Sequence, residues 1–232
     1  MKYAYDFHIH TALSPCGDND MTPNNIVNMA LLKELDIIAI TDHNSCENAA
    51  AVMKVAEGSD LIVIPGMEIE TSEEIHMVCL FPDIISAYQM QEIVYEHLPP
   101  LENRVSIFGE QLILNDQDDI IGENKRLLLT ATSLSIYDVV KYARQFNGVA
   151  IPAHIDRSSY SVLSNLGWIP EDLDVHTLEV SKNVDLEKAK LKYSQYNVIR
   201  SSDAHYLQDI FEREQFLELE SKTISQVIKL LL

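Results

Sequence analysis

Short apolar runs rich in Ile, Val and Leu recur along the chain, and segments with helical spacing lie between them. This alternation is typical of βα units arranged around a parallel sheet or barrel. Seven runs predict strands: Tyr3 to His8, Ile37 to Thr41, Leu61 to Glu68, His76 to Phe81, Val149 to Ala153, Val175 to Val180 and Val198 to Ser202. The pattern therefore predicts an α/β fold in which a βα unit is repeated about seven times.

Helices are expected between these strands. Thr22-Pro23 pairs a capping residue with a proline at the first helical position, which is typical of a helix start. Further helical segments are expected at 44–57, 137–146 and 184–196, and residues 222–232 read as an amphipathic closing helix.

The segment 84–135 interrupts this rhythm. It contains a helix-like stretch, a Pro99-Pro100 break and two apolar runs on either side of the polar residues 115–119. We interpret it as an insertion between the fourth and fifth strands, which could form a hairpin. Such insertions often carry substrate contacts, and a surface decoration packed on the barrel is the alternative of equal weight.

Composition limits the class of protein. The 232 residues are 47% hydrophobic, so one sizeable core can form, and we expect a single domain over 1–232. The formal net charge is −19, from 36 acidic and 17 basic residues, so we expect no binding of duplex nucleic acid through a basic face. Bound divalent cations can still make one cleft positive, so a phosphorylated substrate fits the composition.

The three cysteines, Cys16, Cys46 and Cys79, show no paired spacing, which suits a reducing compartment. The first residues lack the apolar run of a signal peptide, and no stretch reaches the roughly 18 apolar residues of a membrane span. We therefore expect a cytoplasmic protein that has no membrane partner.

Histidines and carboxylates stand where the predicted strands end. Two histidines one residue apart on a strand point to the same side and can bind one ion, as His8 and His10 would. Later strands end at five more such residues: His43, Glu68, His154, Asp203 and His205. The carboxyl ends of strands in a parallel barrel meet at one mouth, so the set predicts a metal site. Any single histidine taken alone could equally be an ordinary hydrogen-bonded side chain.

Imidazole nitrogens combined with carboxylate oxygens suit Zn²⁺, Mn²⁺ or Fe²⁺, and the residues do not choose among them. The ligands outnumber those that one ion needs, and the Glu68 carboxylate could bridge two ions. We therefore expect two or three divalent metal ions, which could clamp the attacking and leaving oxygens of a displacement at phosphorus.

In chain order the motifs are His-x-His, Thr-Asp-His, Gly-x-Glu, an isolated His, Ala-His and Ser-Asp-x-His, and they cover nearly the whole chain. This ordered set resembles the polymerase and histidinol phosphatase superfamily, usually called PHP. The sequences Asp-Phe-His-Ile-His-Thr at 6–11 and Ile-Thr-Asp-His-Asn at 40–44 are especially close to the family pattern. The resemblance implies a distorted, TIM-like (β/α)7 barrel with a trinuclear metal site.

The resemblance also implies how the ligands are shared. The first ion would be held by His8, His10, Glu68 and Asp203, the second by Glu68, His76 and His154, and the third by Asp18, His43 and His205. Asp20 and the Cys16 thiolate are alternatives to Asp18, because Pro15-Cys16-Gly17 stands between the first motif and Asp18. A surface histidine is the alternative for His76, which precedes its apolar strand.

Four residues are expected at the reaction centre: Glu68, Asp203, His205 and Arg157. Arg157 closely follows His154 and could bind a phosphate through two nitrogens, or could pair with a neighbouring carboxylate. Asp42 adjoins a ligand and could either orient it or cap a helix. We interpret His97 and His176 as structural.

These residues predict hydrolysis of phosphate esters, in which a metal-bound hydroxide attacks phosphorus while the ions neutralise phosphoryl charge. The acidic composition favours a small phosphorylated substrate, nucleotides included. An amidohydrolase that cleaves C–N bonds is an alternative, because such enzymes also open with His-x-His; their bridging lysine has no counterpart between Lys54 and Lys125. A metal-bound regulatory module without turnover is the third reading, which the large ligand set disfavours.

Overall fold

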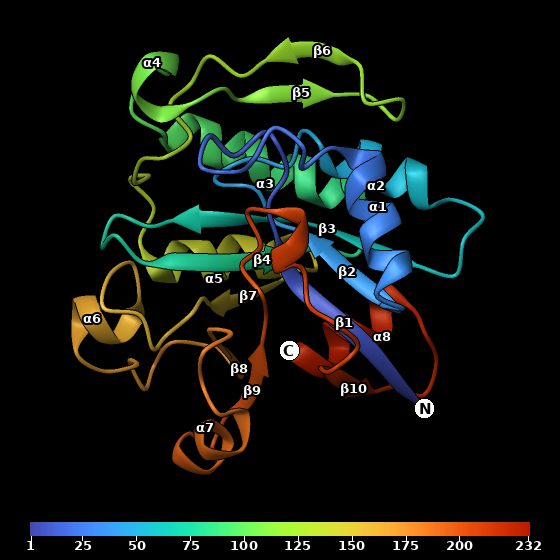
Figure 1. The fold of residues 1–232 in the computed structure, drawn as a ribbon. Coiled ribbons are helices and arrows are strands. Elements are labelled where there is room, and N and C mark those ends of the chain that lie inside the picture. Colours follow the sequence, from blue (N-terminus) through green and yellow to red (C-terminus); the bar gives the residue numbers. More distant parts are fainter.

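The structure, a computed structural model, describes residues 1–232 as an α/β fold (Figure 1). The largest sheet has six strands in the order β10-β1-β2-β3-β4-β7. In chain order these are β1 Lys2–Ile9, β2 Ile37–Ile40, β3 Ile62–Glu70, β4 His76–Leu80, β7 Val149–Pro152 and β10 Phe216–Glu218. Two further pairs are β5 Leu112–Leu114 with β6 Ile120–Glu123, and β8 Thr177–Val180 with β9 Asn197–Arg200.

The six-stranded sheet is mixed and curls into a half barrel. β1, β2 and β3 are parallel, whereas β4 is antiparallel to both β3 and β7, and β10 is antiparallel to β1. The expected α/β, barrel-like fold is confirmed, but the regular series of seven parallel βα units is not found. The reason is local: residues 71–75 link β3 to β4 in a tight turn, and so short a link cannot make the crossover that parallel strands require.

The helices lie largely outside the sheet, and six of the eight α-helices begin at a residue whose side chain caps the helix. Their bounds are α1 Pro23–Leu32, α2 Ala49–Ala56, α3 Ile84–His97, α4 Val105–Phe108, α5 Ile136–Gln145, α6 Val162–Leu166, α7 Leu186–Lys192 and α8 Ile224–Leu231. A short 3₁₀ helix, η1, spans Leu207–Asp209. The Thr22 side chain accepts a hydrogen bond from the Asn25 amide, and Pro23 opens α1, so this predicted start is confirmed. None of the helices combines the length and apolar character that crossing a membrane requires.

Apolar residues form two main clusters, one on each side of the curled sheet. The outer cluster packs the sheet against α1, α2, α3, α5 and α7. The inner cluster fills the concave side with residues such as Tyr5, Phe7, Ile64 and Ile151, and α8 contributes Val227 to it. Figure 1 shows α8 beside β1 and β10, close to both chain ends. The concave side is therefore packed and closed at this end.

A bulge in β1 changes which residues face the concave side. Tyr5 and Phe7 belong to the inner cluster, and strict alternation would place Ile9 there too. Ile9 instead belongs to the outer cluster, and the register of β1 on β2 shifts between Asp6 and Ile9. Bulges of this kind redirect side chains beside functional sites. Here the bulge turns His8 and His10 to the concave side.

The segment expected to be an insertion contains α3, α4 and the β5–β6 hairpin, which lies at the top of Figure 1. Asn48 fastens this hairpin to the barrel, because its side chain donates to the Leu112 carbonyl at 3.0 Å and accepts from the Leu114 amide at 2.9 Å. The same amide nitrogen donates to Thr11 Oγ1 at 2.9 Å. The hairpin is thereby tied to the loop that carries His10. That 84–135 is an insertion relative to other proteins stays a prediction.

Candidate metal centre

Eight of the nine candidate ligands meet at one edge of the curled sheet. His8 lies in β1, Glu68 lies in β3, and five others follow the ends of strands: His10, His43, His154, Asp203 and His205. His76 is the first residue of β4. Because β4 runs antiparallel to its neighbours, its first residue lies at the edge where the parallel strands end. The unusual place of His76 in the sequence thus has a geometric explanation.

Glu68 is the centre of this cluster and is buried. Its Oε1 lies 2.8 Å from His76 Nδ1, 3.1 Å from His154 Nε2 and 3.3 Å from His8 Nε2. Its Oε2 lies 3.1 Å from His43 Nδ1 and 3.5 Å from His10 Nε2. One carboxylate therefore faces five imidazoles that come from four strands or their ends, which is the position that a bridging ligand needs.

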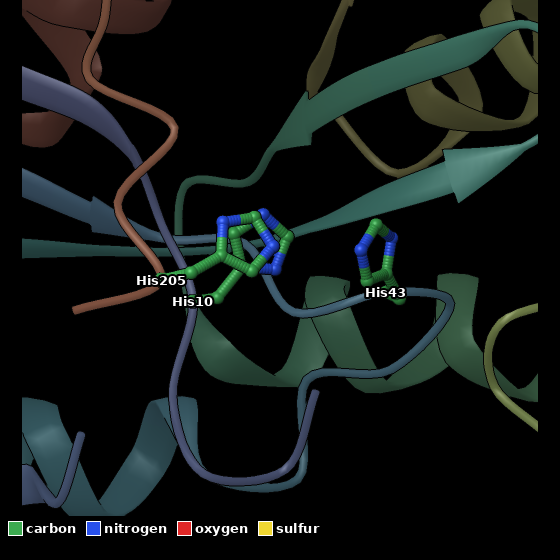
Figure 2. A group of neighbouring side chains, drawn as sticks. All are labelled: His10, His43 and His205. Carbon is green, nitrogen blue, oxygen red and sulfur yellow. The ribbon is translucent and has the colours of Figure 1, made fainter. Parts of the chain in front are cut away.

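Three overlapping groups of donor atoms could each hold an ion: His8, His10 and Asp203; His43, Glu68 and His76; and His10, His43 and His205. Figure 2 shows the last group, in which the His10 and His205 rings lie one over the other and His43 stands to the side. The ring centroids of His10 and His205 are 4.1 Å apart. The donor atoms of each group lie within 4.8 Å of one another.

The structure does not bring Asp18 into any of these groups. Its carboxylate accepts a hydrogen bond from the Asp20 amide at 2.9 Å, and both acids line a small hollow beside Tyr206. The loop that begins at Pro15 places Cys16, not Asp18, in the cavity beside His43. Where Asp18 was expected with His43 and His205, the third ligand of the group is His10. This geometry gives the prediction of Asp18 as a ligand no support.

Two of the candidate ligands adopt strained backbone conformations. His154 has φ +28° and Asp203 has φ +52°, both in the region that residues other than glycine rarely occupy. Such strain costs roughly 1–3 kcal/mol per residue and persists where surrounding contacts fix it, commonly at functional sites. The His154 amide donates to Glu179 Oε1 at 3.2 Å, which is one such contact.

Glu179 is a buried residue of this centre that the sequence reading missed. Its Oε1 accepts a hydrogen bond from His8 Nδ1 at 2.9 Å, which leaves His8 Nε2 facing Glu68. Carboxylates commonly hold metal-binding histidines in this way. Glu179 is a polar residue within the predicted strand 175–180, and that pattern break is the signal that could have identified it.

A second network supports His10 and His43 from behind. Ser14 Oγ lies 3.0 Å from His10 Nδ1 and accepts from the His43 amide at 3.1 Å. Asp42 accepts from Ser14 Oγ at 2.7 Å and from the Thr11 amide at 2.7 Å. Of the two roles considered for Asp42, orienting the ligands therefore agrees with the structure, whereas α2 begins after Asn48.

Burial and charge act in opposite directions on the cluster. Burial alone would raise the pKa of Glu68, but the imidazoles of His76, His8 and His43 outweigh it and hold that pKa well below its usual range. Burial would lower the pKa of His8, but Glu179, Glu68 and Asp203 together raise it well above the usual value. Both shifts favour the charged forms, so a Glu68 carboxylate lies beside a protonated His8 at this edge.

Unpartnered buried atoms show that the residues fit divalent cations. His8 Nε2, His10 Nε2 and Asp203 Oδ1 are buried without a hydrogen-bond partner, and these residues form one of the three donor groups. Leaving such atoms unsatisfied costs about 1–3 kcal/mol each. A cation of the class that imidazole and carboxylate suit would satisfy all three together.

A cavity of about 390 Å³ opens onto the cluster. It is lined by Cys16, His43, Glu68, Glu70, His76, Phe108, Leu129, Arg157, Tyr160, Asp203 and His205. The Arg157 side chain is 46% exposed, and its Nη2 lies 2.6 Å from Asp203 Oδ2. Of the two alternatives for Arg157, the ion pair is thus present, and the guanidinium still faces the cavity. The structure brings Arg157, Glu68, Asp203 and His205 together as expected of the reaction centre, whereas His97 and His176 lie outside this cavity.

The family model described as "PHP domain" matches residues 6–230. The chain belongs to the PHP domain family. The resemblance seen in the sequence is thereby confirmed, and the expectation of a metal-dependent hydrolase gains support.

Among curated relatives, the 5′-3′ exoribonuclease Rnm of Escherichia coli (strain K12) is 33% identical over 113 residues, which are 47% of this chain and 37% of Rnm. An uncharacterized protein of Methanocaldococcus jannaschii is 30% identical over 123 residues, 50% of this chain and 15% of that protein. The chain thus spans well under half of either relative.

Among solved structures, the lesion-specific endonuclease Q of Pyrococcus furiosus matches with a TM-score of 0.72 and 17% identity, covering 100% of this chain and 56% of that one. A protein from Bifidobacterium adolescentis described as a metal-dependent phosphoesterase matches with a TM-score of 0.60 and 20% identity, covering 87% of both chains. At these identities the likeness shows a shared fold.

One expectation is wrong. We expected no duplex nucleic acid because the chain is acidic, yet a complex of endonuclease Q with a 27-mer duplex substrate matches this fold with a TM-score of 0.74 and 18% identity, over 99% of this chain and 56% of that one. Net charge is a poor guide here, because charges more than about 10 Å from a cleft are largely screened at physiological salt. The acidic composition therefore excludes no class of nucleic acid.

Proposed function

We propose that this chain is a metal-dependent phosphoesterase whose reaction centre is the cluster around Glu68. One observation carries the proposal: a single buried carboxylate faces five imidazoles, and three overlapping donor groups surround it. The ions, when bound, would supply Lewis acidity that neutralises phosphoryl charge and lowers the pKa of an attacking water. Zn²⁺, Mn²⁺ and Fe²⁺, two or three in number, fit these ligands best.

The protein's own residues orient the metal ligands and place a positive charge at the cavity. Glu179 and Ser14 hold His8 and His10 in fixed orientations, so the ligand nitrogens need little rearrangement on binding. Arg157 reaches the cavity from the Asp203 side and can form two parallel hydrogen bonds to phosphoryl oxygens. A phosphate would therefore lie between the cluster and the Arg157 guanidinium.

For the substrate class we propose phosphate esters of nucleotides, either free or at a strand end. The relatives named an exoribonuclease and an endonuclease support nucleic acid, and the cavity of about 390 Å³ lies in the roughly 300–1,000 Å³ range of small-molecule sites. A small phosphorylated metabolite without a base is the competing substrate from the sequence reading.

The test is metal analysis of the purified protein, followed by turnover with each recovered metal. The panel contains a nucleoside monophosphate, a sugar phosphate, a single-stranded and a duplex oligonucleotide, and an amide substrate. We expect hydrolysis of phosphate esters that a chelator abolishes and added metal restores. Cleavage of the amide alone would favour the amidohydrolase alternative, and metal binding without any turnover would favour the regulatory module.

A further inference from the structure

We propose that Tyr160 and Phe108 form a nucleobase-binding subsite beside the metal-ligand cluster, an inference that rests on the proposed phosphoesterase function. The cavity has two chemically different parts. Glu68, His76 and Asp203 line the part suited to metal and phosphate. Tyr160 and Phe108 also line it; Tyr160 lies in the loop between β7 and α6, and Phe108 is the last residue of α4.

The Tyr160 ring is covered on one side by another ring, and much of the residue is exposed. It stacks on the His76 ring with centroids 4.8 Å apart and an angle of 28° between the planes. The residue is nevertheless 47% exposed, so a second planar ring can stack on its outer side. Stacking of this kind is how proteins hold nucleobases without regard to base identity.

Tyr160 has a strained backbone conformation, and a hydrogen bond holds the residue in place. Its φ is +54°, which is a true outlier for a bulky side chain. The Tyr160 carbonyl accepts a hydrogen bond from the His76 amide at 3.0 Å, so the strained residue is fixed to the strand that carries a candidate ligand. Strain of this kind is retained where a side chain must be aimed.

Phe108 is positioned by an equally tight contact. It ends α4, and the next residue, Gly109, has φ +101° and lies against Pro15 so closely that an added Cβ would be 2.4 Å from the Pro15 carbonyl oxygen. This close packing fixes Phe108 against the loop that carries Cys16, at the cavity. The segment 84–135 thus supplies part of the site that binds the substrate.

The first test compares matched substrates. Wild type and Tyr160→Leu would be assayed on adenosine 5′-monophosphate and ribose 5-phosphate, which share a phosphate and differ by the base. We expect Tyr160→Leu to lower kcat/KM for the nucleotide about 5- to 150-fold and to leave the sugar phosphate unchanged. Tyr160→Phe should retain activity because it keeps the ring. Tyr137→Leu, at a tyrosine of similar exposure outside the cavity, is the control and should change neither substrate.

A parallel pair separates the two sources of the base. Wild type and Tyr160→Leu would also be assayed on a 5′-phosphorylated single strand and on the same strand lacking its terminal base. A loss of kcat/KM only on the strand with the base would show that the subsite serves strand ends, and a loss only on the free nucleotide would show that it serves free nucleotides. An equal loss on substrates with and without a base would mean that Tyr160 only supports His76, and would overturn the subsite.

A binding measurement separates this proposal from the proposed function. In ¹H–¹³C spectra of tyrosine-labelled protein, the Tyr160 ring signals are those missing in Tyr160→Phe. We expect adenosine to shift them and ribose to leave them in place. Such shifts in a protein that hydrolyses no ester would retain the subsite and reject the phosphoesterase. Absent shifts in an active enzyme would reject the subsite and retain the phosphoesterase.

Discussion

The two ends of the concave side of the sheet are built from the same strands, but one end buries apolar side chains and the other buries ionisable ones. At one end, Phe7 and Ile64 are buried among other apolar side chains, and α8 covers them. At the other end, His8 and Glu68 are equally buried but lie among ionisable groups, and His8 Nε2 has no hydrogen-bond partner. The apolar end stabilises the fold, whereas the unpartnered polar atoms at the other end destabilise it.

Strain is distributed in the same way. Asn44, His154, Tyr160 and Asp203 all have positive φ and lie at the ligand edge or beside it, and Glu74, also with positive φ, lies in the turn just before His76. The other three non-glycine residues with positive φ, which lie away from this edge, are Glu34, Asp118 and Asn147. The inner cluster gains stability from packing alone, so its residues should be replaceable only at the expense of folding. The ligand edge should be replaceable at the expense of metal and activity.

The largest effect is expected from Phe7→Ala. Phe7 is fully buried in the inner cluster, and such truncations cost about 3–5 kcal/mol because the cavity left behind collapses only in part. Denaturant unfolding would measure the loss. Phe216→Ala, on the half-exposed side of β10, is the control and should cost under about 1 kcal/mol. If metal stoichiometry per folded molecule also fell, the two ends would not be separate in function.

Glu68→Gln should reduce kcat about 10²- to 10³-fold, because an amide nitrogen replaces one anionic oxygen at the atom pair that faces five imidazoles. Metal content should fall together with activity. His76→Gln removes one ligand of one donor group, so excess metal should partly restore the activity of this variant. Full metal content and near-normal turnover in Glu68→Gln would show that Glu68 is not a bridge.

Glu179→Gln should weaken metal affinity about 10- to 100-fold without loss of the fold, because the carboxylate that orients His8 is replaced by a neutral amide. The measurement is a metal titration combined with ¹⁵N spectra of the His8 ring, which report its tautomer. Glu70→Gln is the control for the His8 tautomer, which it should leave unchanged, since Glu70 lies 4.0 Å from His76 Nε2 and does not contact His8. An unchanged tautomer and affinity would make Glu179 a purely structural residue.

The smallest effect is expected on the outer face, at the start of α5. Ser135 and Asp138 form a capping box, so Ser135→Ala should cost about 1 kcal/mol near neutral pH. Hydrogen bonds from Ser135 lower the pKa of Asp138 below its ordinary 3.8. The ionised form is thus favoured in the folded state, and its contribution is present above pH 3.8 and is lost as pH falls through the lowered folded pKa.

Because Asp138 is only partly buried, solvent screening keeps this contribution to the free energy of unfolding small. The stability difference between Ser135→Ala and wild type should nevertheless narrow in acid. Ser161→Ala removes a capping box that has no carboxylate, so its cost should not change with pH. Parallel acid profiles for the two variants would contradict this account.

Much of the fold was predictable because local chemistry sets it. Thr22-Pro23 and the apolar runs predicted α1 and the strands close to their observed positions. Strand direction was not predictable in this way: an apolar run such as His76 to Phe81 has the same composition whether it runs parallel or antiparallel. The direction of β4 followed from a tight turn at 71–75 that the sequence reading did not weigh.

The sequence alone determined which residue types gather at the ends of strands, since motif order and spacing are properties of the chain. Tertiary structure decided which of them meet. The Asp18 carboxylate bonds to the Asp20 amide and stays outside the donor groups, and a bulge in β1 turns His8 and His10 inward. Glu179, distant in sequence from His8, became its partner only when β8 came to lie near β1. Such long-range pairings depend on backbone geometry summed over the whole fold, which no local pattern contains.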